Sequence, residues 1–315
     1  MDFKRLSYFV RIAELGSLSK AADRLHIAQP ALSRQMRLLE QDVGVPLFKR
    51  HRRGMQLTLE GEEFRARLVG PLRQIELARE DTRSLSKEVG GNVAFGMPPT
   101  TSYVLAGPLA RRVAQQAPSV SLRVVEGYAG HLIDWLQRGE IDVALLYGQA
   151  SDYRLAAEDL LVEELMLVGP PDCELSPNRP VAFAQLGNLP LVLPSHPHGL
   201  RVVVDNMAAR TKVKLKVRFQ ADSFQLMKEL VTSGLGYTTL PYSSFSREAA
   251  AGGLKYAPIH RPRVTRQLVL ATQSATDTSR AARRLGILIR QEIVALVAAG
   301  KWTATLLFDA DAFQE

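Results

Sequence analysis

The chain has 315 residues, enough for two or three domains, and its 46% hydrophobic and 23% charged residues are typical of a folded globular protein rather than a disordered one. No run approaches the roughly 18 apolar residues of a membrane span, the N-terminus lacks a signal-peptide core, and the single cysteine excludes an intramolecular disulfide, so we expect a cytoplasmic protein with no membrane partner. The net charge is +8, and residues 1–60 hold 11 basic but only 6 acidic side chains, which favours an anionic partner for the N-terminal part. A solubilising basic face is the alternative interpretation of the charge alone.

Residues 3–25 predict two consecutive helices. Apolar residues recur at helical spacing from Phe3 to Leu15, so the first helix should end at Gly16. Ser17 or Ser19 can cap a second, short helix in "SKAADRL". The tight connection "HIAQ" follows, with His26 expected at positive φ, where His is tolerated better than most residues. This arrangement is typical of a helix-turn-helix.

A third helix should start near Pro30 and end at Gly44. Its buried stripe is predicted to contain Leu32, Met36, Leu39 and Val43. Gln29, Ser33, Arg34 and Arg37 share another face. An amide, a hydroxyl and two guanidinium groups suit base edges and phosphates, so this face is a candidate DNA reader. On an isolated helix the same residues would more often form a solvated polar face; the preceding turn and the basic surroundings favour DNA.

The segment "VPLFKRHRRGMQLT" predicts two short strands around a turn. Gly54 allows the bend, and four cations crowd its tip: Lys49, Arg50, Arg52 and Arg53. A basic hairpin beside a recognition helix is a wing, whose cations would meet phosphates or the minor groove and make binding fall with salt. A nuclear-localisation-like basic run is the competing interpretation, without any supporting feature.

The stretch "GSLSKAADRLHIAQPALSRQMRLLEQDVGVPLFKRHRRGMQLTLEG" resembles the DNA-binding domain of LysR-type transcriptional regulators. "HIAQPALS" is similar to the subgroup containing the nitrogen assimilation control protein. The resemblance implies DNA contacts by Gln29, Pro30, Ser33 and Arg34, and wing contacts by Arg50, Arg52 and Arg53. The implied partners are double-stranded promoter DNA and, for an activator, RNA polymerase.

Residues 59–89 predict a long charged linker helix. Coiled-coil seam spacing relates Phe64, Leu68, Pro71, Ile75, Ala78, Thr82 and Leu85. A bland surface helix would not need so regular a stripe, although Ala and Thr make it weak. Together with the resemblance, the stripe predicts a homodimer or homotetramer. Gly90–Gly91 marks the domain boundary.

Residues 92–300 alternate strand and helix signals, which predicts a mostly parallel α/β architecture in two lobes. In such sheets, ligands bind beyond the carboxyl ends of the strands, near helix N-termini. Several strand-end loops carry polar residues, for which ordinary helix capping is the alternative for any one loop.

The phrases "LQRGEIDVALLY" and "LVTSGLGYTTLP" match recurrent LysR-type patterns. The resemblance implies an α+β multidomain protein: a winged helix-turn-helix (1–58), a linker helix (59–89), and a two-lobed domain of the type 2 periplasmic-binding-protein fold (90–302). Lobe 1 would take about 90–161 and 268–302, lobe 2 about 162–267, and a tail 303–315. A small-molecule effector, such as an organic anion, would bind between the lobes. The candidate contacts, taken by loop position, are Thr100, Thr101, Ser102, Tyr128, Tyr147, Ser195, His196 and Asp222.

The leading functional prediction is therefore a ligand-responsive regulator that binds an interrupted palindrome. A solute-binding protein of the same fold would lack the basic N-terminal unit. An enzyme would need a nucleophile, an acid–base pair or a cofactor loop, and the sequence shows none; His196-Pro197-His198 is too small a cluster for zinc. We expect no cofactor, no metal and no catalytic residue.

Overall fold

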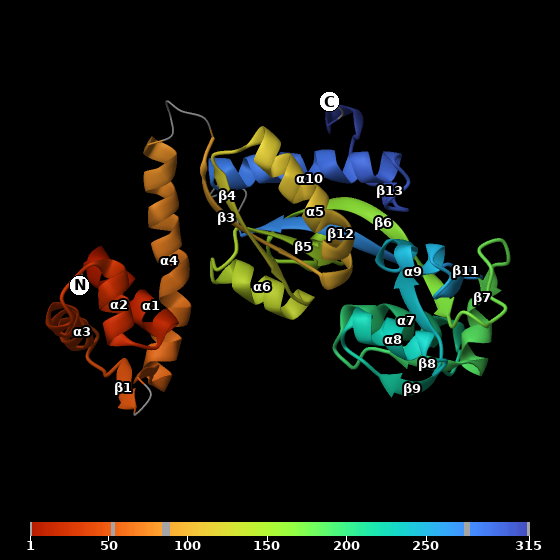
Figure 1. The fold of residues 1–315 in the computed structure, drawn as a ribbon, viewed down its shortest axis with the longest axis horizontal. Coiled ribbons are helices and arrows are strands. Elements are labelled where there is room, and N and C mark those ends of the chain that lie inside the picture. Colours follow the sequence, from red (N-terminus) through yellow and green to blue (C-terminus); the bar gives the residue numbers. More distant parts are fainter. Residues whose placement is uncertain (1, 52–53, 84–88, 274–277, 314–315) are drawn as a thin grey trace. The chain divides into compact units, whose positions relative to one another are not determined.

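The structure is a computed structural model that describes residues 2–51, 54–83, 89–273 and 278–313 (Figure 1). The chain divides into two compact units. The first comprises Met1–Lys87 with Trp135–Glu140, and the second comprises Glu88–Asp134 with Ile141–Glu315. No helix of the described part is long and apolar enough to cross a membrane.

Three short helices open the first unit: α1 (Phe3–Leu15), α2 (Leu18–Leu25) and α3 (Gln29–Val43). Ser17 accepts a hydrogen bond from the Lys20 N–H and so caps α2, as its sequence position predicted. Gly16, His26 and Gly44 end the three helices in the left-handed conformation. The predicted positive φ of His26 is confirmed at 54°.

A single hydrophobic core holds the first unit together. Phe9 is fully buried at its centre, with its ring centroid 5.2 Å from that of Phe48 and 5.3 Å from that of Phe64. The predicted stripe of α3 is buried there at Leu32, Met36 and Leu39, with Val43 partly buried beside it. Because this stripe faces the core, the opposite side of α3 faces outward.

The predicted hairpin forms from β1 (Phe48–His51) and β2 (Gly54–Leu57), paired antiparallel with Phe48 opposite Leu57. The Met55 N–H donates to the Gly16 carbonyl at 2.8 Å, so β2 lies against the turn between α1 and α2. A Cβ at Gly54 would lie 2.3 Å from the same carbonyl oxygen. Glycine at this position therefore permits a close approach that any side chain would block.

The linker helix is α4 (Leu59–Arg83), which begins after Thr58; the hydroxyl of this residue accepts from the Gly61 N–H at 2.9 Å. The predicted coiled-coil seam of α4 falls into a buried part and an exposed part. Phe64 and Leu68 pack into the core of the first unit, whereas the later members Pro71, Ile75, Ala78 and Thr82 are exposed. Leu85 lies outside the described residues.

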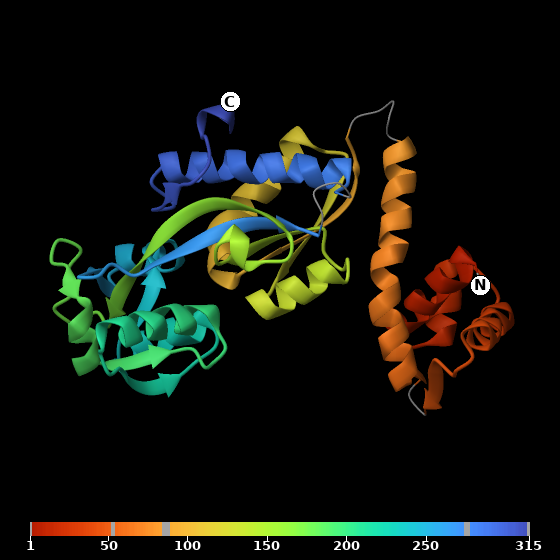
Figure 2. The ribbon, with the colours of Figure 1, turned by 180° about the vertical axis from the view of Figure 1, so that it is seen from behind.

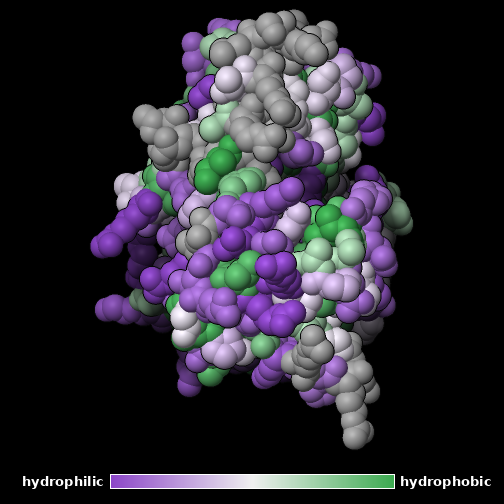
Figure 3. All heavy atoms as spheres, turned by 90° about the vertical axis from the view of Figure 1, so that its left-hand side faces the viewer, coloured by the Kyte–Doolittle hydropathy of each residue, from purple (hydrophilic) through white to green (hydrophobic). Residues whose placement is uncertain are grey.

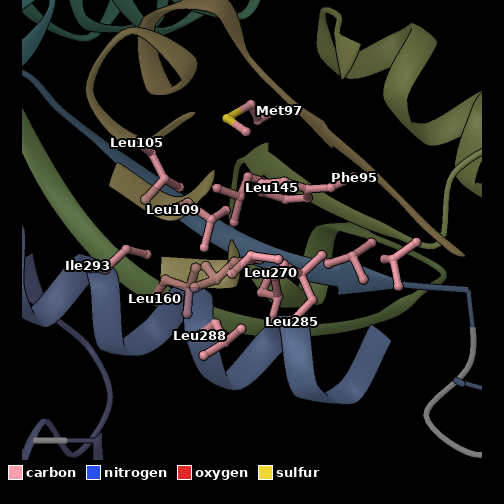
Figure 4. Close-up of a cluster of buried hydrophobic side chains, with 14 of the residues drawn as sticks. Phe95, Met97, Leu105, Leu109, Leu145, Leu160, Leu270, Leu285, Leu288 and Ile293 are labelled. Atoms are coloured by element: carbon pink, nitrogen blue, oxygen red, sulfur yellow. The ribbon is translucent and has the colours of Figure 1, made fainter. Parts of the chain in front are cut away.

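The second unit contains two lobes, each with its own hydrophobic core. In the first lobe, β3 (Gly91–Met97) pairs in parallel with β4 (Val120–Glu126) and β5 (Val143–Tyr147). The lobe's helices are α5 (Pro99–Gln116), α6 (Ala129–Gln137), which belongs to this unit up to Asp134, and α10 (Arg280–Ala298). Figure 4 shows that Phe95, Leu145 and Leu270 of the sheet meet Leu285 and Leu288 of α10.

Two long strands connect the lobes: β6 (Ala156–Gly169) and β12 (Thr265–Thr272). They pair antiparallel, and β12 also pairs antiparallel with β5. The predominantly parallel sheet that the alternation predicted is therefore wrong for this part; the sheet is mixed. The reason is topological, because a chain that leaves a lobe and returns must run in both directions along the connection.

The second lobe is built around the far end of β6. There β10 (Thr238–Pro241) and β11 (Lys255–His260) pair with it antiparallel, and β7 (Val181–Ala182) pairs with β11. A separate parallel pair is formed by β8 (Pro190–Leu193) and β9 (Lys216–Gln220). The lobe's helical segments are α7 (Gly199–Thr211), α8 (Phe224–Thr232), α9 (Ser246–Ala250), η2 (Phe183–Asn188) and η3 (Tyr242–Ser244). Figure 2 shows the lobe from behind.

Three short elements complete the second unit. The 3-10 turn η1 (Ala150–Asp152) follows β5. After α10 the chain forms β13 (Thr305–Leu306), which pairs antiparallel with β6, and then the turn η4 (Asp311–Phe313).

Candidate functional site

The outward side of α3 carries the polar residues that the sequence singles out. Gln29, Pro30, Arg34 and Arg37 are exposed, and Ser33 is half-buried. Ala28 precedes the helix and contributes no side-chain cap, and a proline stands in the first turn. The side of the molecule that carries α3 is mainly hydrophilic, with scattered apolar residues (Figure 3).

One carboxylate near the end of α3 accepts hydrogen bonds from the start of the wing, the hairpin of β1 and β2. Glu40 Oε1 accepts hydrogen bonds from the Leu47 N–H at 2.8 Å and the Phe48 N–H at 3.1 Å. Glu40 therefore joins α3 to the first strand of the hairpin. Of the predicted wing cations, Arg50 belongs to β1, whereas Arg52 and Arg53 lie outside the described residues.

In the second unit, a partly enclosed cavity of about 60 Å³ lies between the two lobes. We call it the interlobe cavity. It is lined by Pro98, Pro99, Thr100, Tyr128, Ala129, Tyr147, His198, Gly199, Leu200, Phe224, Met227, Leu240 and Arg266. The first residues of four helices, α5, α6, α7 and α8, are among them. Helix N-termini carry partial positive charge, so their convergence favours an anionic or electron-rich ligand group.

A buried polar network forms one wall of the interlobe cavity. The Arg266 guanidinium donates from Nε to Glu163 Oε1 at 2.8 Å and from Nη2 to Thr100 Oγ1 at 2.9 Å. The same guanidinium lies 3.7 Å from the centre of the Tyr147 ring, and the Tyr147 hydroxyl donates to Glu163 Oε1 at 3.0 Å. Glu163 is only 2% exposed, so its charge depends on these partners.

Burial raises the pKa of the Tyr147 phenol well above its ordinary value, although the Arg266 guanidinium acts in the opposite direction. The hydroxyl therefore stays protonated and can donate. Thr101 Oγ1 lies 2.8 Å from it. The chemistry of this wall is thus a compensated ion pair surrounded by hydroxyl groups.

A second part of the lining is organised around Tyr128 and His198, whose ring centroids are 4.6 Å apart in an edge-to-face contact. His198 Nδ1 accepts from the Leu200 N–H at 3.1 Å, so in the neutral ring the proton resides on Nε2. Burial lowers the pKa of His198 below its ordinary value, and nearby Asp222 partly opposes this effect. His198 is therefore a neutral donor at the cavity.

The predicted effector residues fall into three groups. Thr100, Tyr128 and Tyr147 line the interlobe cavity. Thr101 and Ser102 are buried in the first turn of α5 and are not among the lining residues.

Ser195, Asp222 and His196 form the third group, outside the lining residues. Asp222 accepts from the Ser195 N–H at 2.8 Å, and its backbone carbonyl accepts from the Tyr128 hydroxyl. His196 turns away: its Nε2 lies 2.8 Å from Asp205 Oδ2, and its side chain is 59% exposed.

Sequence reasoning missed Glu163, Arg266 and His198. Glu163 lies in a strand that is mostly apolar, and that pattern could have marked it as buried and paired, whereas Arg266 is flanked by Thr265 and Gln267. For His198 the only signal in the sequence was the nearby His196, two residues before it. Among the described residues, no group of three or more His, Cys, Asp or Glu side chains could hold a metal ion.

A winged helix-turn-helix unit, a long helix and a two-lobed domain with a cavity between its lobes define a ligand-responsive DNA-binding regulator. Comparison with known proteins identifies the family of this regulator. A model described as "Bacterial regulatory helix-turn-helix protein, lysR family" matches residues 3–62, and one described as "LysR substrate binding domain" matches residues 86–293. The chain belongs to the LysR family of transcriptional regulators, which are not enzymes.

Individual relatives agree with this assignment. The HTH-type transcriptional regulator BbuR of Bordetella bronchiseptica is 29% identical over 96% of this chain and 93% of its own length. The nitrogen assimilation regulatory protein nac of Klebsiella aerogenes is 31% identical over 86% and 88%, which supports the predicted subgroup resemblance.

Solved structures show the same fold. A full-length OxyR variant from Pseudomonas aeruginosa superposes with a TM-score of 0.75 at 25% identity, covering 92% of this chain and 95% of that one. CbnR in complex with its target DNA superposes with a TM-score of 0.67 at 22% identity, covering 93% and 100%.

Proposed function

We propose that α3 and the wing form the surface that binds double-stranded promoter DNA. The contacts would come from Gln29, Pro30, Ser33, Arg34, Arg37, Arg50, Arg52 and Arg53. The observation that carries this proposal is the outward polar face of α3, which the buried stripe on its other side holds in place beside the basic hairpin. CbnR, a protein of the same fold, was solved with its target DNA.

A DNA phosphate would complete the start of α3. Ala28 leaves the first backbone N–H groups without a side-chain acceptor, and Pro30 has no N–H to satisfy. Phosphate oxygens bind readily at such helix ends. We therefore expect Ala28→Ser to stabilise the free protein by about 0.5–2 kcal/mol while changing DNA affinity little.

The arrangement in solution would be a homodimer or homotetramer that reads an interrupted palindrome. The exposed residues of α4, including Ile75, support pairing through this helix. We propose residues 1–58 as the DNA-binding domain, 59–89 as the linker helix, 90–302 as the effector-binding domain and 303–315 as a tail. We propose a cytoplasmic location, because promoter DNA is the partner.

A mobility-shift assay on the promoter region of the protein's own gene tests the DNA surface. Arg34→Ala should weaken specific binding by about 1–3 kcal/mol if Arg34 contacts a base. Arg11→Ala is the matched control, because it removes the same charge from α1, where Arg11 pairs with Glu14 at 2.8 Å. Equal losses from both variants would contradict the proposed surface, and an equal loss from Arg34→Ala on all DNA sequences would make Arg34 a phosphate contact.

For the interlobe cavity we propose a small organic acid as the effector. The ion pair of Arg266 and Glu163 is neutral overall, so the attraction for an anion comes from the four helix N-termini and the His198 Nε2–H donor. Proline, leucine, phenylalanine and methionine side chains form the remaining walls and suit an apolar body. Binding would shift the population of lobe arrangements and so change DNA binding.

Butyrate and its neutral amide, butyramide, form a matched pair of probes for this proposal. A ligand that binds only the native state stabilises it by RT ln(1 + [L]/Kd), so a thermal-shift titration at equal concentrations ranks the two compounds by affinity. Butyrate should raise the melting temperature more than butyramide does. An equal effect would indicate a neutral effector, and a wider panel of organic, amino and aromatic acids then identifies the preferred body.

A further inference from the structure

The C-terminal segment, residues 300–313, is built into the first lobe. Trp302 is 1% exposed and belongs to the hydrophobic core of that lobe. Beyond it, Thr305 and Leu306 pair with Val162 and Leu161 of β6, and the Leu307 N–H donates to the Leu160 carbonyl at 2.9 Å. This segment lies outside residues 86–293, to which the effector-domain model of the family extends.

The indole of Trp302 also makes a directed polar contact. Its Nε1–H donates to Glu163 Oε2 at 3.0 Å. The other oxygen of Glu163, Oε1, accepts from Arg266 and from Tyr147. One carboxylate therefore joins the C-terminal segment on one side to two lining residues of the interlobe cavity on the other.

We propose that the C-terminal segment contributes to the effector site. Trp302 is a positioning residue that holds Glu163 in place and, through Glu163, also Arg266 and Tyr147. This inference rests on the proposed role of the interlobe cavity as the effector site. Trp302 itself is not among the residues that line the cavity, so its effect on a ligand is indirect.

The physical reason lies in the burial of the carboxylate. A carboxylate that is 2% exposed must satisfy both oxygens from protein donors. When the indole N–H is removed, Glu163 Oε2 loses its hydrogen-bond donor. The carboxylate then recovers hydrogen bonding by rotating toward Arg266 and Tyr147, which donate to Oε1. Arg266 would then shift from Thr100, to which it now donates at 2.9 Å, and the wall of the cavity would lose its geometry.

Core packing alone would not need this arrangement. A phenylalanine would fill an apolar site without bringing an N–H that must find an acceptor in the interior. The indole N–H of Trp302 finds this acceptor in Glu163, whose carboxylate also supports the cavity wall. Loss of the N–H should therefore affect the cavity more than it affects the overall fold.

The test compares two variants of the full-length protein. Trp302→Phe removes the donor and keeps an aromatic ring, whereas Leu306→Ala removes packing from the same segment and keeps the donor. Hydrogen exchange measured by mass spectrometry follows residues 98–104 and 264–268, which contain Thr100 and Arg266. We expect exchange there to accelerate about tenfold in Trp302→Phe and to stay at the wild-type rate in Leu306→Ala.

Butyrate affinity provides the second measurement, with an expected loss of about tenfold in Trp302→Phe and none in Leu306→Ala. If both variants change exchange and affinity in proportion to their loss of melting temperature, Trp302 is only structural and the inference is overturned. If butyrate fails to bind the wild-type protein, the organic-acid proposal fails, and the exchange measurement still decides the role of Trp302.

A subtler replacement covers the case in which Trp302→Phe does not fold. Benzothienylalanine, introduced at position 302 by nonsense suppression, keeps the shape of indole but has sulfur in place of the N–H. The same tenfold changes are expected from it. Wild-type exchange in this variant would refute the positioning role.

Discussion

Gly61 stands in the first turn of α4, where the linker helix passes over the loop that leads into the wing. A Cβ at this position would lie 2.1 Å from the carbonyl oxygen of Leu47 and 3.1 Å from Cδ2 of Leu57. The Leu47 backbone cannot easily move away. Its N–H donates to Glu40 at 2.8 Å, and its carbonyl accepts from the Thr58 N–H at 3.0 Å.

Two opposing effects determine the outcome of Gly61→Ala. Alanine is favoured over glycine within a helix by about 1 kcal/mol. The contact at 2.1 Å lies well below 3.0 Å, a distance under which real Cβ atoms essentially never approach a neighbour, so α4 or the loop must shift. Overpacking of this kind costs about 1–3 kcal/mol or more, and here it also strains the two hydrogen bonds in which the Leu47 backbone takes part. We expect a net destabilisation of the N-terminal unit by about 2 kcal/mol.

Differential scanning calorimetry of the full-length protein tests this expectation, with the transition of the N-terminal unit identified by its shift on adding promoter DNA. A loss of about 2 kcal/mol corresponds to roughly 10 °C for a unit of this size. Gly130→Ala in α6 is the control, because a Cβ there meets nothing within 4 Å. It should be neutral or stabilising by up to about 1 kcal/mol. A wild-type or higher melting temperature for Gly61→Ala would refute the close-packing argument.

Variants at three further positions test other features of the molecule. Glu40→Ala should accelerate amide exchange at Leu47 and Phe48 by about 30-fold or more, and Glu40→Gln by less because it keeps an acceptor; wild-type exchange in both would show that the carboxylate does not hold the wing. The folded-state pKa of His198 is depressed, so the unfolded chain takes up the proton first on acidification, and stability should fall as the pH drops below about 6.5. His198→Asn, which keeps an N-cap acceptor, should reduce that fall, and identical pH profiles would exclude the contribution. Ile75→Glu should shift sedimentation toward smaller assemblies, and an unchanged profile would place the dimer contact elsewhere.

Local chemistry made much of the N-terminal unit predictable from sequence. Helix ends depend on neighbouring residues, so Ser17 and Gly16 mark them directly. The spacing of apolar residues along α3 identifies which side is buried and therefore which side is free to meet DNA. Ser279 likewise caps α10, where its side chain accepts from the Ala282 N–H.

The interlobe cavity depended on contacts between distant parts of the chain. Glu163 and Arg266 are 103 residues apart, and Glu163 and Trp302 are 139 apart. Loop position indicated Thr100, Tyr128 and Tyr147, which the structure brings to the cavity. Loop position could not indicate which of His196 and His198 lines the cavity. That choice depends on which ring caps α7 and which faces Asp205.

By itself, the sequence determined the helix-turn-helix, the wing, the long helix and the α/β character of the remainder, because each follows from the order of residues within a few turns or strands. Only the tertiary structure decided the direction of the connecting strands, the partners of the buried charges and the place of the C-terminal segment. The physical reason is that a buried charge is stable only where its counter-charge and hydrogen-bond donors lie, and folding brings these together from positions that no local pattern relates.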